Sequence, residues 1–319
     1  MNVAEASTTL VWGAATAYAI ALVCFTMLLA RAADRAVVEA PATVGAKVGG
    51  QTTTADARTD VLEPAPRRSK AEGIARATVL AGLVLHVGAV VTRGIAAGRA
   101  PWANLYEFML VGGLVAVVVL LVVQREKVIP FLGTAVVGIV VLFLAVAQVN
   151  FFVPADGVQP ALQSYWLVIH VGVAVIATGV FTVGFVAAIL QMLRASRAEG
   201  SARLAGRRWG WLDATGTPSA LESLSFRLNA VGFVLWTFTL IAGAIWAEHA
   251  WGRYWGWDPK EVWTFVVWVV YAGYLHARTT RGWAGRRSAW LVVVAYACVV
   301  ANFTLVNILF PGLHSYANV

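Results

Sequence analysis

Histidine is the side chain here best suited to hold a metal ion, because neutral imidazole is a common metal ligand. Of the five histidines, His170 and His314 lie near the ends of long apolar runs, on either side of an aromatic stretch in the sequence. That stretch, residues 246–268, contains six of the 14 tryptophans together with several charged side chains. It is too polar for a bilayer interior and too aromatic for an ordinary loop, so it predicts an aromatic surface at a membrane–water boundary.

The tryptophan-rich loop carries both flat apolar surfaces and charge. Its aromatic candidates are Trp251, Trp255 and Trp257, and its two cationic side chains are Arg253 and Lys260. Heme is a planar, apolar ligand with a central metal, and it would use imidazoles on the iron, indole faces against the ring and cations for its propionates. Two axial histidines would leave no open position for oxygen, which favours carrying heme over activating O₂.

The end of this loop has the pattern of a helix start. Asp258 is a suitable N-cap, Pro259 suits the first helical position, and Glu261 completes the D-x-x-E capping box. This structural role competes with any direct contact between Asp258 and a ligand. Asn104 and Glu107 have the same spacing at the start of another apolar run and predict a second capping box.

The other three histidines lie elsewhere in the sequence. His86 lies ~18 Å into an apolar run, where it is compatible with a functional role or with a hydrogen bond to a neighbouring helix. His276 lies ~25 Å along the run that follows the tryptophan-rich loop, near the opposite membrane face. His249 lies within the loop, and no role is assigned to it.

Composition identifies the fold class. The 319 residues are 60% hydrophobic and only 13% charged, which leaves too few polar residues to cover a soluble globular domain. Backbone groups in lipid must bond within their own segment, so the apolar runs predict helices. We expect an all-α polytopic membrane protein. It should have about eight transmembrane helices, near residues 8–30, 74–97, 105–124, 128–149, 165–193, 224–247, 261–277 and 289–310.

The distribution of basic residues predicts the topology. With the N-terminus outside, all but four of the 24 lysines and arginines fall in or beside cytoplasmic loops; the four are Arg93, Arg99, Arg253 and Lys260. Both termini and the tryptophan-rich loop are therefore expected on the extracytoplasmic side of the plasma membrane. The net charge of +8 reflects this topology and contact with anionic membrane lipid, and it predicts no nucleic-acid partner.

The chain divides into three parts. Residues 1–30 predict a first transmembrane helix with a short external tail, and no cleavable signal peptide is evident. Residues 31–73 are rich in Ala, Thr, Gly and Pro and predict a disordered cytoplasmic linker. Residues 74–319 are expected to form the membrane domain that handles the ligand, with the tryptophan-rich loop at 246–263.

The run W-G-R-Y-W-G-W-D-P-K-E-V-W at 251–263, followed by Y-L-H-A-R at 274–278, resembles the tryptophan-rich "WWD" signature of the CcsA/ResC family. These heme-handling proteins form the membrane half of the System II cytochrome c synthetase. The resemblance extends to three further motifs: P-W-A-N-L-Y-E-F at 101–108, S-Y-W-L-V-I-H at 164–170 and G-L-H-S-Y at 312–316. It covers about residues 93–316 and identifies the chain as a cytochrome c biogenesis protein of this type.

This resemblance implies that His170 and His314 are external heme ligands and that His276 binds heme on the inner side. The cargo would be heme b, carried from the cytoplasmic side to the external site and presented to the CxxCH thiols of apocytochrome c. The implied partners are a separate ResB-type membrane protein, with which the chain would form a heme lyase, and a thiol-reducing thioredoxin-like protein. His86 could substitute for a partner histidine, although no motif assigns it this role.

Three other functions remain open from the residues alone. An exporter of heme or another amphipathic solute, without attachment activity, would be expected to show internal repeats and broken helices, and no convincing pair occurs. An electron-transfer cytochrome of the b type would pair histidines at matching depth on facing helices, and His276 has no evident partner of that kind. A structural subunit would use all of its histidines in hydrogen bonds.

Overall fold

Helices make up most of the chain that the computed structural model describes, which is residues 2–38, 70–125, 128–157 and 164–314. There is no strand within these residues. The helices are α1 (Val3–Val38), α2 (Lys70–Ala97), α3 (Leu105–Val123), α4 (Pro130–Asn150), α5 (Tyr165–Ala198), α6 (Pro218–Trp251), α7 (Pro259–Thr280), α8 (Arg286–Phe303) and α9 (Leu305–Leu309). A 3₁₀ helix, η2 (Arg207–Thr215), lies between α5 and α6.

Seven spans among the described residues are long and apolar enough to cross a membrane, which confirms the prediction of an all-α polytopic membrane protein. They are α1 to α6 and the segment Arg286–Leu309, which contains α8 and α9. The remaining apolar run, predicted near residues 261–277, forms α7. This helix has 22 residues and is not among the seven, but it packs against α8 and α6 as part of the same bundle.

The expected linker lies mainly outside the described residues. Helix α1 continues to Val38 and α2 begins at Lys70, so helix occupies both edges of the predicted segment 31–73. Residues 39–69, between those helices, are not described, and neither are residues 315–319 after His314.

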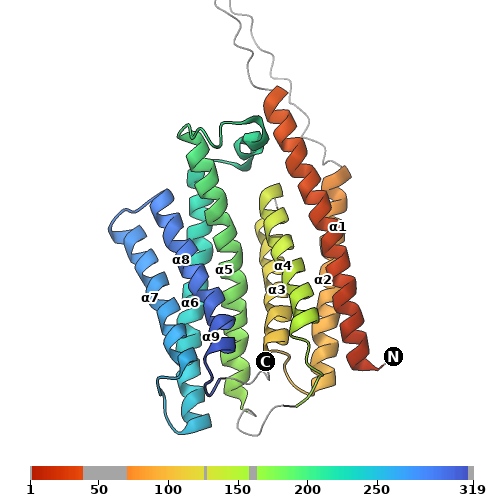
Figure 1. Cartoon of the computed structure of the whole chain (residues 1–319), viewed down its shortest axis with the longest axis vertical. Coiled ribbons are helices and arrows are strands. Elements are labelled where there is room, and N and C mark those ends of the chain that lie inside the picture. The colour runs from red at the N-terminus through yellow and green to blue at the C-terminus, as the bar shows by residue number, and fades with distance from the viewer. Residues whose placement is uncertain (1, 39–69, 126–127, 158–163, 315–319) are drawn as a thin grey trace, which may run out of the picture.

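The helices form two adjoining groups (Figure 1). In the first group, α1 packs against α2 and α4, and α3 packs against α4. In the second group, α5 packs against α6 and α8, and α7 packs against α8; contact between α3 and α5 joins the two groups. The start of α1, the α2–α3 turn, the α6–α7 loop and α9 all lie at one end, the lower end in Figure 1. We refer to it as the loop end.

The predicted start of α7 is confirmed. The Asp258 side chain accepts a hydrogen bond from the backbone of the first turn, the Glu261 side chain accepts one from the backbone N–H of Asp258, and Pro259 occupies the first helical position. The carboxylate of Glu261 also accepts from the N–H of Gly256 at 2.7 Å. The helix start therefore holds the end of the tryptophan-rich loop by several short bonds.

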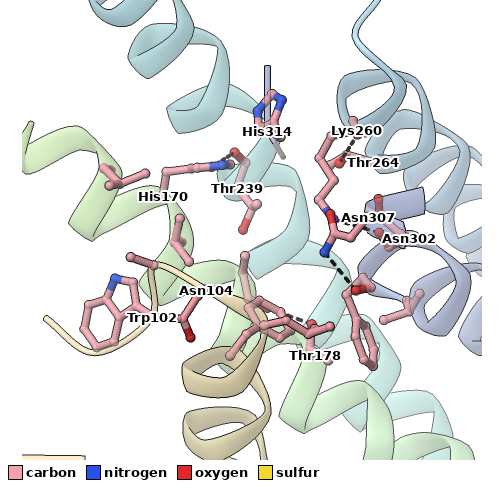
Figure 2. A pocket seen from close by; sticks show the side chains of 18 of the residues that line it. Trp102, Asn104, His170, Thr178, Thr239, Lys260, Thr264, Asn302, Asn307 and His314 are labelled. Carbon is pink, nitrogen blue, oxygen red and sulfur yellow. Dashed lines mark hydrogen bonds between the residues drawn. The ribbon is translucent and has the colours of Figure 1, made fainter. Parts of the chain in front are cut away.

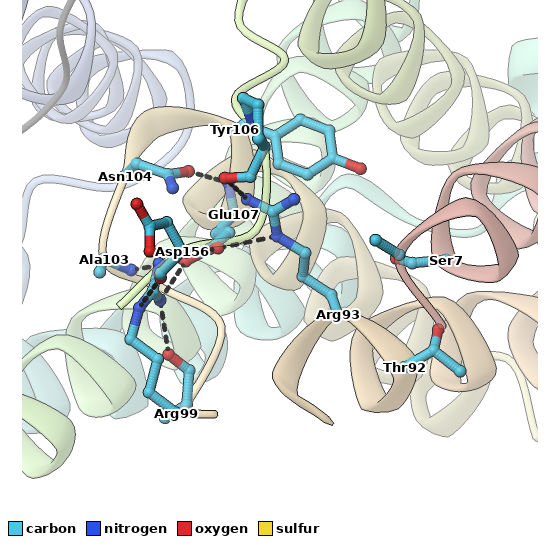
Figure 3. Close-up of polar contacts among 12 residues, drawn as sticks. Ser7, Thr92, Arg93, Arg99, Ala103, Asn104, Tyr106, Glu107 and Asp156 are labelled. Atoms are coloured by element: carbon cyan, nitrogen blue, oxygen red, sulfur yellow. Dashed lines mark hydrogen bonds and ion pairs between the residues drawn. The ribbon is translucent and has the colours of Figure 1, made fainter. Parts of the chain in front are cut away.

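The second predicted cap has an additional role. Asn104 is the N-cap of α3, and its side chain accepts from the N–H of Glu107 at 2.9 Å. The Glu107 carboxylate is fully buried and forms ion pairs with Arg93 at 2.8 Å and with Arg99 at 2.6 Å (Figure 3). It also accepts from the N–H of Ala103 at 2.9 Å. Glu107 thus neutralises one of two arginines at the turn between α2 and α3.

The same arginines attach the α4–α5 connection to this turn. Arg93 donates to the Pro154 carbonyl at 3.3 Å, and Arg99 donates to the Asp156 carbonyl at 3.0 Å. The ion cluster therefore links three segments at the loop end of the bundle (Figure 3). One of them contains residues 102–104, which form part of the candidate site described below.

We expect Glu107→Ala to lower the free energy of unfolding by about 3–5 kcal/mol, because it leaves two arginines without their shared carboxylate in a buried position. Denaturation of the purified protein in mixed detergent micelles would measure this change. The matched control is Glu199→Ala, since Glu199 pairs with Arg286 at 3.4 Å and both side chains are more than half exposed. The control should cost less than about 1 kcal/mol. Equal losses from the two variants would contradict the structural importance of the cluster.

Candidate functional site

A cavity at the loop end contains both histidines that flank the tryptophan-rich loop (Figure 2). The space between its walls is about 1060 Å³, including the part open to solvent. Its polar lining consists of Asn104, His170, Thr178, Thr239, Lys260, Thr264, Asn302, Asn307 and His314. Its aromatic lining consists of Trp102, Phe108, Trp236, Trp246 and Phe303. Helices from both groups contribute to it.

His170 lies in the second turn of α5 and is oriented by α6. Its Nδ1 donates to the backbone carbonyl of Thr239 at 2.9 Å. Because a carbonyl only accepts, the bonded nitrogen carries the proton and Nε2 of the neutral ring keeps its lone pair. Gly243 makes room for this ring, since a Cβ there would lie 2.6 Å from His170 Cε1. The indole of Trp246 is nearly parallel to the imidazole, with centroids 6.0 Å apart.

His314 lies after α9 and is oriented by the start of α7. Its Nδ1 lies 2.8 Å from Asp258 Oδ1, so the carboxylate accepts the Nδ1 proton. Nε2 of His314 is therefore the nitrogen with the lone pair, as it is in His170. The His314 ring meets Trp246 and Trp251 edge to face, with centroids 5.5 and 5.0 Å away. A carboxylate behind an imidazole is the usual arrangement for a histidine that binds a metal.

The Asp258 carboxylate accepts hydrogen bonds from two segments at once. Besides His314, it accepts from the N–H of Leu313 at 2.6 Å and from the N–H of Lys260 at 3.1 Å. Burial would raise the pKa of the Asp258 carboxyl. The hydrogen bond from His314 and those from the two backbone N–H groups outweigh burial and hold that pKa below its usual range. Asp258 is thus ionised at neutral pH and serves both as the helix cap and as the partner of His314.

The two cations of the loop have different positions. Lys260 lines the cavity, and its Nζ donates to the Asn302 carbonyl at 2.7 Å and to Asn307 Oδ1 at 2.6 Å (Figure 2). Both of these partners are neutral. Arg253 is 3.5 Å from Glu261, lies over the Trp251 ring and lines neither cavity that contains the histidines. The cavity therefore contains one of the two predicted cations.

The three tryptophans that the sequence predicted to contact the ligand also differ in their positions relative to the cavity. Trp251 packs against Trp246 and His314, behind the cavity wall. Trp255 lines a smaller adjoining cavity, which His170 and His314 also line. Trp257 lines neither cavity; it is 77% exposed and has a φ of 60°. This left-handed backbone conformation costs a non-glycine residue about 1–2 kcal/mol.

The remaining histidines lie away from the cavity. His86 is fully buried between α1, α2 and α3, and its ring nitrogens are 3.3 Å from the Tyr18 hydroxyl and 2.9 Å from the Leu110 carbonyl. His276 is exposed on α7, where it contacts Thr280 one turn on. His249 is exposed in the last turn of α6. The structure thus brings together His170 and His314 and leaves these three apart.

Several residues that line the cavity were not predicted from the sequence. Trp246 begins the tryptophan-rich stretch but was not predicted to contact the histidines. Asn302 and Asn307 could have been found, because amide side chains are unusual in an apolar run and there commonly bind another helix. No local signal indicates that Thr239 offers its carbonyl to His170, since every residue in a helix presents a carbonyl.

Comparison with known proteins gives consistent matches. The family model described as cytochrome c assembly protein matches residues 102–314, which include the histidines of the cavity and the whole tryptophan-rich loop. The chain is 35% identical over 263 residues to the cytochrome c biogenesis protein CcsA of Synechococcus sp. (strain CC9902), covering 76% of this chain and 86% of that protein. It is 36% identical over 263 residues to CcsA of Prochlorococcus marinus (strain MIT 9303), covering 74% and 81%.

A solved structure has a similar fold. The cytochrome c heme lyase CcmF superposes with a TM-score of 0.65 at 17% sequence identity, over 96% of this chain and 47% of that protein. This chain therefore spans about half the length of CcmF, and at this identity the likeness shows the fold alone. The family match and the identity to CcsA proteins over most of both chains carry more weight. The chain belongs to the cytochrome c assembly protein family and is a CcsA-type cytochrome c biogenesis protein.

Proposed function

We propose that this protein carries heme b from the cytoplasmic side of the plasma membrane to the cavity at the loop end. There, His170 and His314 ligate the iron and the heme is presented to the CxxCH thiols of apocytochrome c. The observation that carries the proposal is the matched hydrogen bonding of the two rings. Both line one cavity, and both have Nδ1 bonded to an acceptor of the protein, which leaves Nε2 as the metal-binding nitrogen.

The rest of the cavity supports heme as the cargo. The apolar and aromatic walls suit a porphyrin ring, whereas the propionates need a positive charge or hydrogen-bond donors. Lys260 supplies a hydrogen-bond donor within the cavity, with Asn302 and Asn307 beside it. Arg253, which is paired with Glu261, supports the loop in this proposal and does not bind the cargo directly.

The attachment reaction itself needs little from the protein. In each linkage the thiol adds across a heme vinyl group: the sulfur bonds to the carbon next to the ring, and the thiol proton goes to the terminal carbon. No net electron transfer occurs in this addition. The proposed role of the chain is to hold the heme by its iron and propionates, because the reactivity belongs largely to heme and the thiols.

Charge placement supports the membrane topology that this direction of transport requires. Four arginines of the helix ends and η2 (Arg197, Arg207, Arg208 and Arg286) lie at the end opposite the cavity, which supports a cytoplasmic position for that end. Both termini and the tryptophan-rich loop would then be extracytoplasmic, and the segment between α1 and α2 would be cytoplasmic. His276, exposed on α7, would receive heme at a surface shared with a separate ResB-type chain. A thioredoxin-like protein would keep the acceptor thiols reduced.

We expect wild-type protein, purified with its partner, to show the absorption spectrum of low-spin bis-histidine heme. His170→Ala and His314→Ala should each abolish that spectrum and most of the bound heme, because each removes one axial ligand. Heme content per protein and the optical spectrum measure both effects. His249→Ala is the control, since this histidine is exposed and lines neither cavity. Full heme content in both cavity variants would refute the site.

Asp258→Asn should lower heme affinity by about 10–100-fold and raise the midpoint potential of the bound heme, because a neutral amide makes His314 a less basic ligand. Asparagine is a good N-cap, so α7 should still form. Heme titration and a spectroscopic redox titration give the two values. An unchanged potential with unchanged affinity would mean that Asp258 acts only as a cap.

Gly243→Ala should reduce heme affinity indirectly, through His170. The added methyl would displace the His170 ring from the Thr239 carbonyl. Gly273→Ala is the matched control in α7, where a Cβ would meet nothing within 4 Å. The control should bind heme as the wild type does and be slightly more stable, since alanine favours helix over glycine. Normal heme binding by both variants would show that α6 does not position His170.

A further inference from the structure

We infer that Trp257 is a docking residue for the acceptor polypeptide, the CxxCH segment of apocytochrome c, and not part of the surface that holds heme. This inference rests on the proposed function, because the acceptor exists only if heme is handed over at this cavity. It concerns a different contact, however: the one between the rim of the cavity and the incoming chain. Three observations support it: the backbone conformation of Trp257, its position beside the cavity and the exposure of its side chain.

The backbone of Trp257 is in a conformation that only glycine adopts elsewhere in the described part of the chain. Among the described residues, the positions with positive φ are Gly98, Gly200, Gly216, Gly252, Gly282, Gly285 and Trp257. The same loop thus has glycine at its first left-handed position, Gly252, and the largest side chain at its second. A bulky residue is retained in such a conformation when its side chain serves a function that glycine cannot serve.

The loop holds Trp257 in this conformation from both sides. Glu261 Oε2 accepts from the N–H of Gly256 at 2.7 Å and from the N–H of Asp258 at 3.1 Å, the two residues that flank Trp257. Asp258 is in turn bonded to His314. The backbone around Trp257 is therefore connected through one residue to a proposed heme ligand, while its side chain is exposed.

Trp257 lies on the rim of the histidine site. Its ring meets Trp255 edge to face with centroids 5.7 Å apart, and Trp255 lines the smaller cavity together with His170 and His314. Trp257 itself lines neither cavity and is 77% exposed. An acceptor must bring its thiols to heme held in the cavity, and Trp257 contacts a residue that lines the smaller cavity. A fixed, exposed indole is a typical anchor for a polypeptide.

Contact with the membrane explains the exposed side chain and left-handed backbone of Trp257 less well than docking of a polypeptide does. Two other exposed tryptophans lie on regular helices: Trp12 on α1 is 47% exposed and Trp290 on α8 is 55% exposed. These residues reach the surface with ordinary helical backbone. An interfacial indole would not require the left-handed conformation of Trp257.

The test compares Trp257→Gly with Trp283→Gly, which removes an exposed loop tryptophan from the opposite end of the bundle. Each full-length protein, purified with its partner, is titrated against a fluorescent apocytochrome c peptide that contains reduced CxxCH. Trp257→Gly should raise the Kd of the peptide by about tenfold or more, as expected for an anchor tryptophan. Its heme content should be unchanged and its unfolding temperature equal or higher, because glycine suits this φ. Trp283→Gly should leave the Kd unchanged.

Each other outcome overturns the inference. Unchanged peptide affinity with normal heme would show that the acceptor does not use Trp257, while the proposed function would stand. Lost heme in Trp257→Gly would assign this residue to the heme surface. Impaired cytochrome c maturation in cells with unchanged peptide affinity in detergent would assign it to the membrane interface. Absence of heme from the wild-type protein and its partner would instead refute the proposed function itself, before the variants are compared.

Discussion

The carboxylate of Asp258 connects the start of α7 to the segment that follows α9. Its oxygens accept from the N–H of Lys260 and, more than 50 residues further along the chain, from the N–H of Leu313 and from the His314 ring. Gly312 allows this approach, since a Cβ there would lie 2.4 Å from Asp258 Oδ2. Because one ionised side chain caps a helix and orients an imidazole, the position of His314 depends on where α7 begins.

The other side of the cavity depends on the buried ion cluster at the α2–α3 turn. Glu107 lies between two arginines, and those arginines hold the carbonyls of the α4–α5 connection. This arrangement places residues 102–104 against α5, where His170 is bonded to α6. The cavity therefore lies between two groups of helices, each stabilised by its own charged network. A heme bound there would contact both groups.

Four tryptophans of the stretch 246–268 differ in how deeply they are buried. Trp246 is buried between the two histidines, Trp251 packs behind His314, Trp255 lines the smaller cavity and Trp257 projects outward. One aromatic segment thus provides a wall for the proposed heme and an exposed residue at the rim. This difference in burial agrees with the proposed function, in which a second polypeptide reaches heme held in the cavity.

Local patterns in the sequence determined the helical membrane fold, the start of α7 and the choice of His170 and His314 as candidates. Hydropathy, capping residues and spacing act within a few residues of each other, so they can be read without the fold. Only the tertiary structure showed that Glu107 pairs with two arginines, that Asp258 bonds to His314, and that Trp246 lies between the histidines while Trp257 does not. These contacts join residues far apart in the chain. They depend on which face each helix turns toward its neighbour, and packing of the whole bundle decides that.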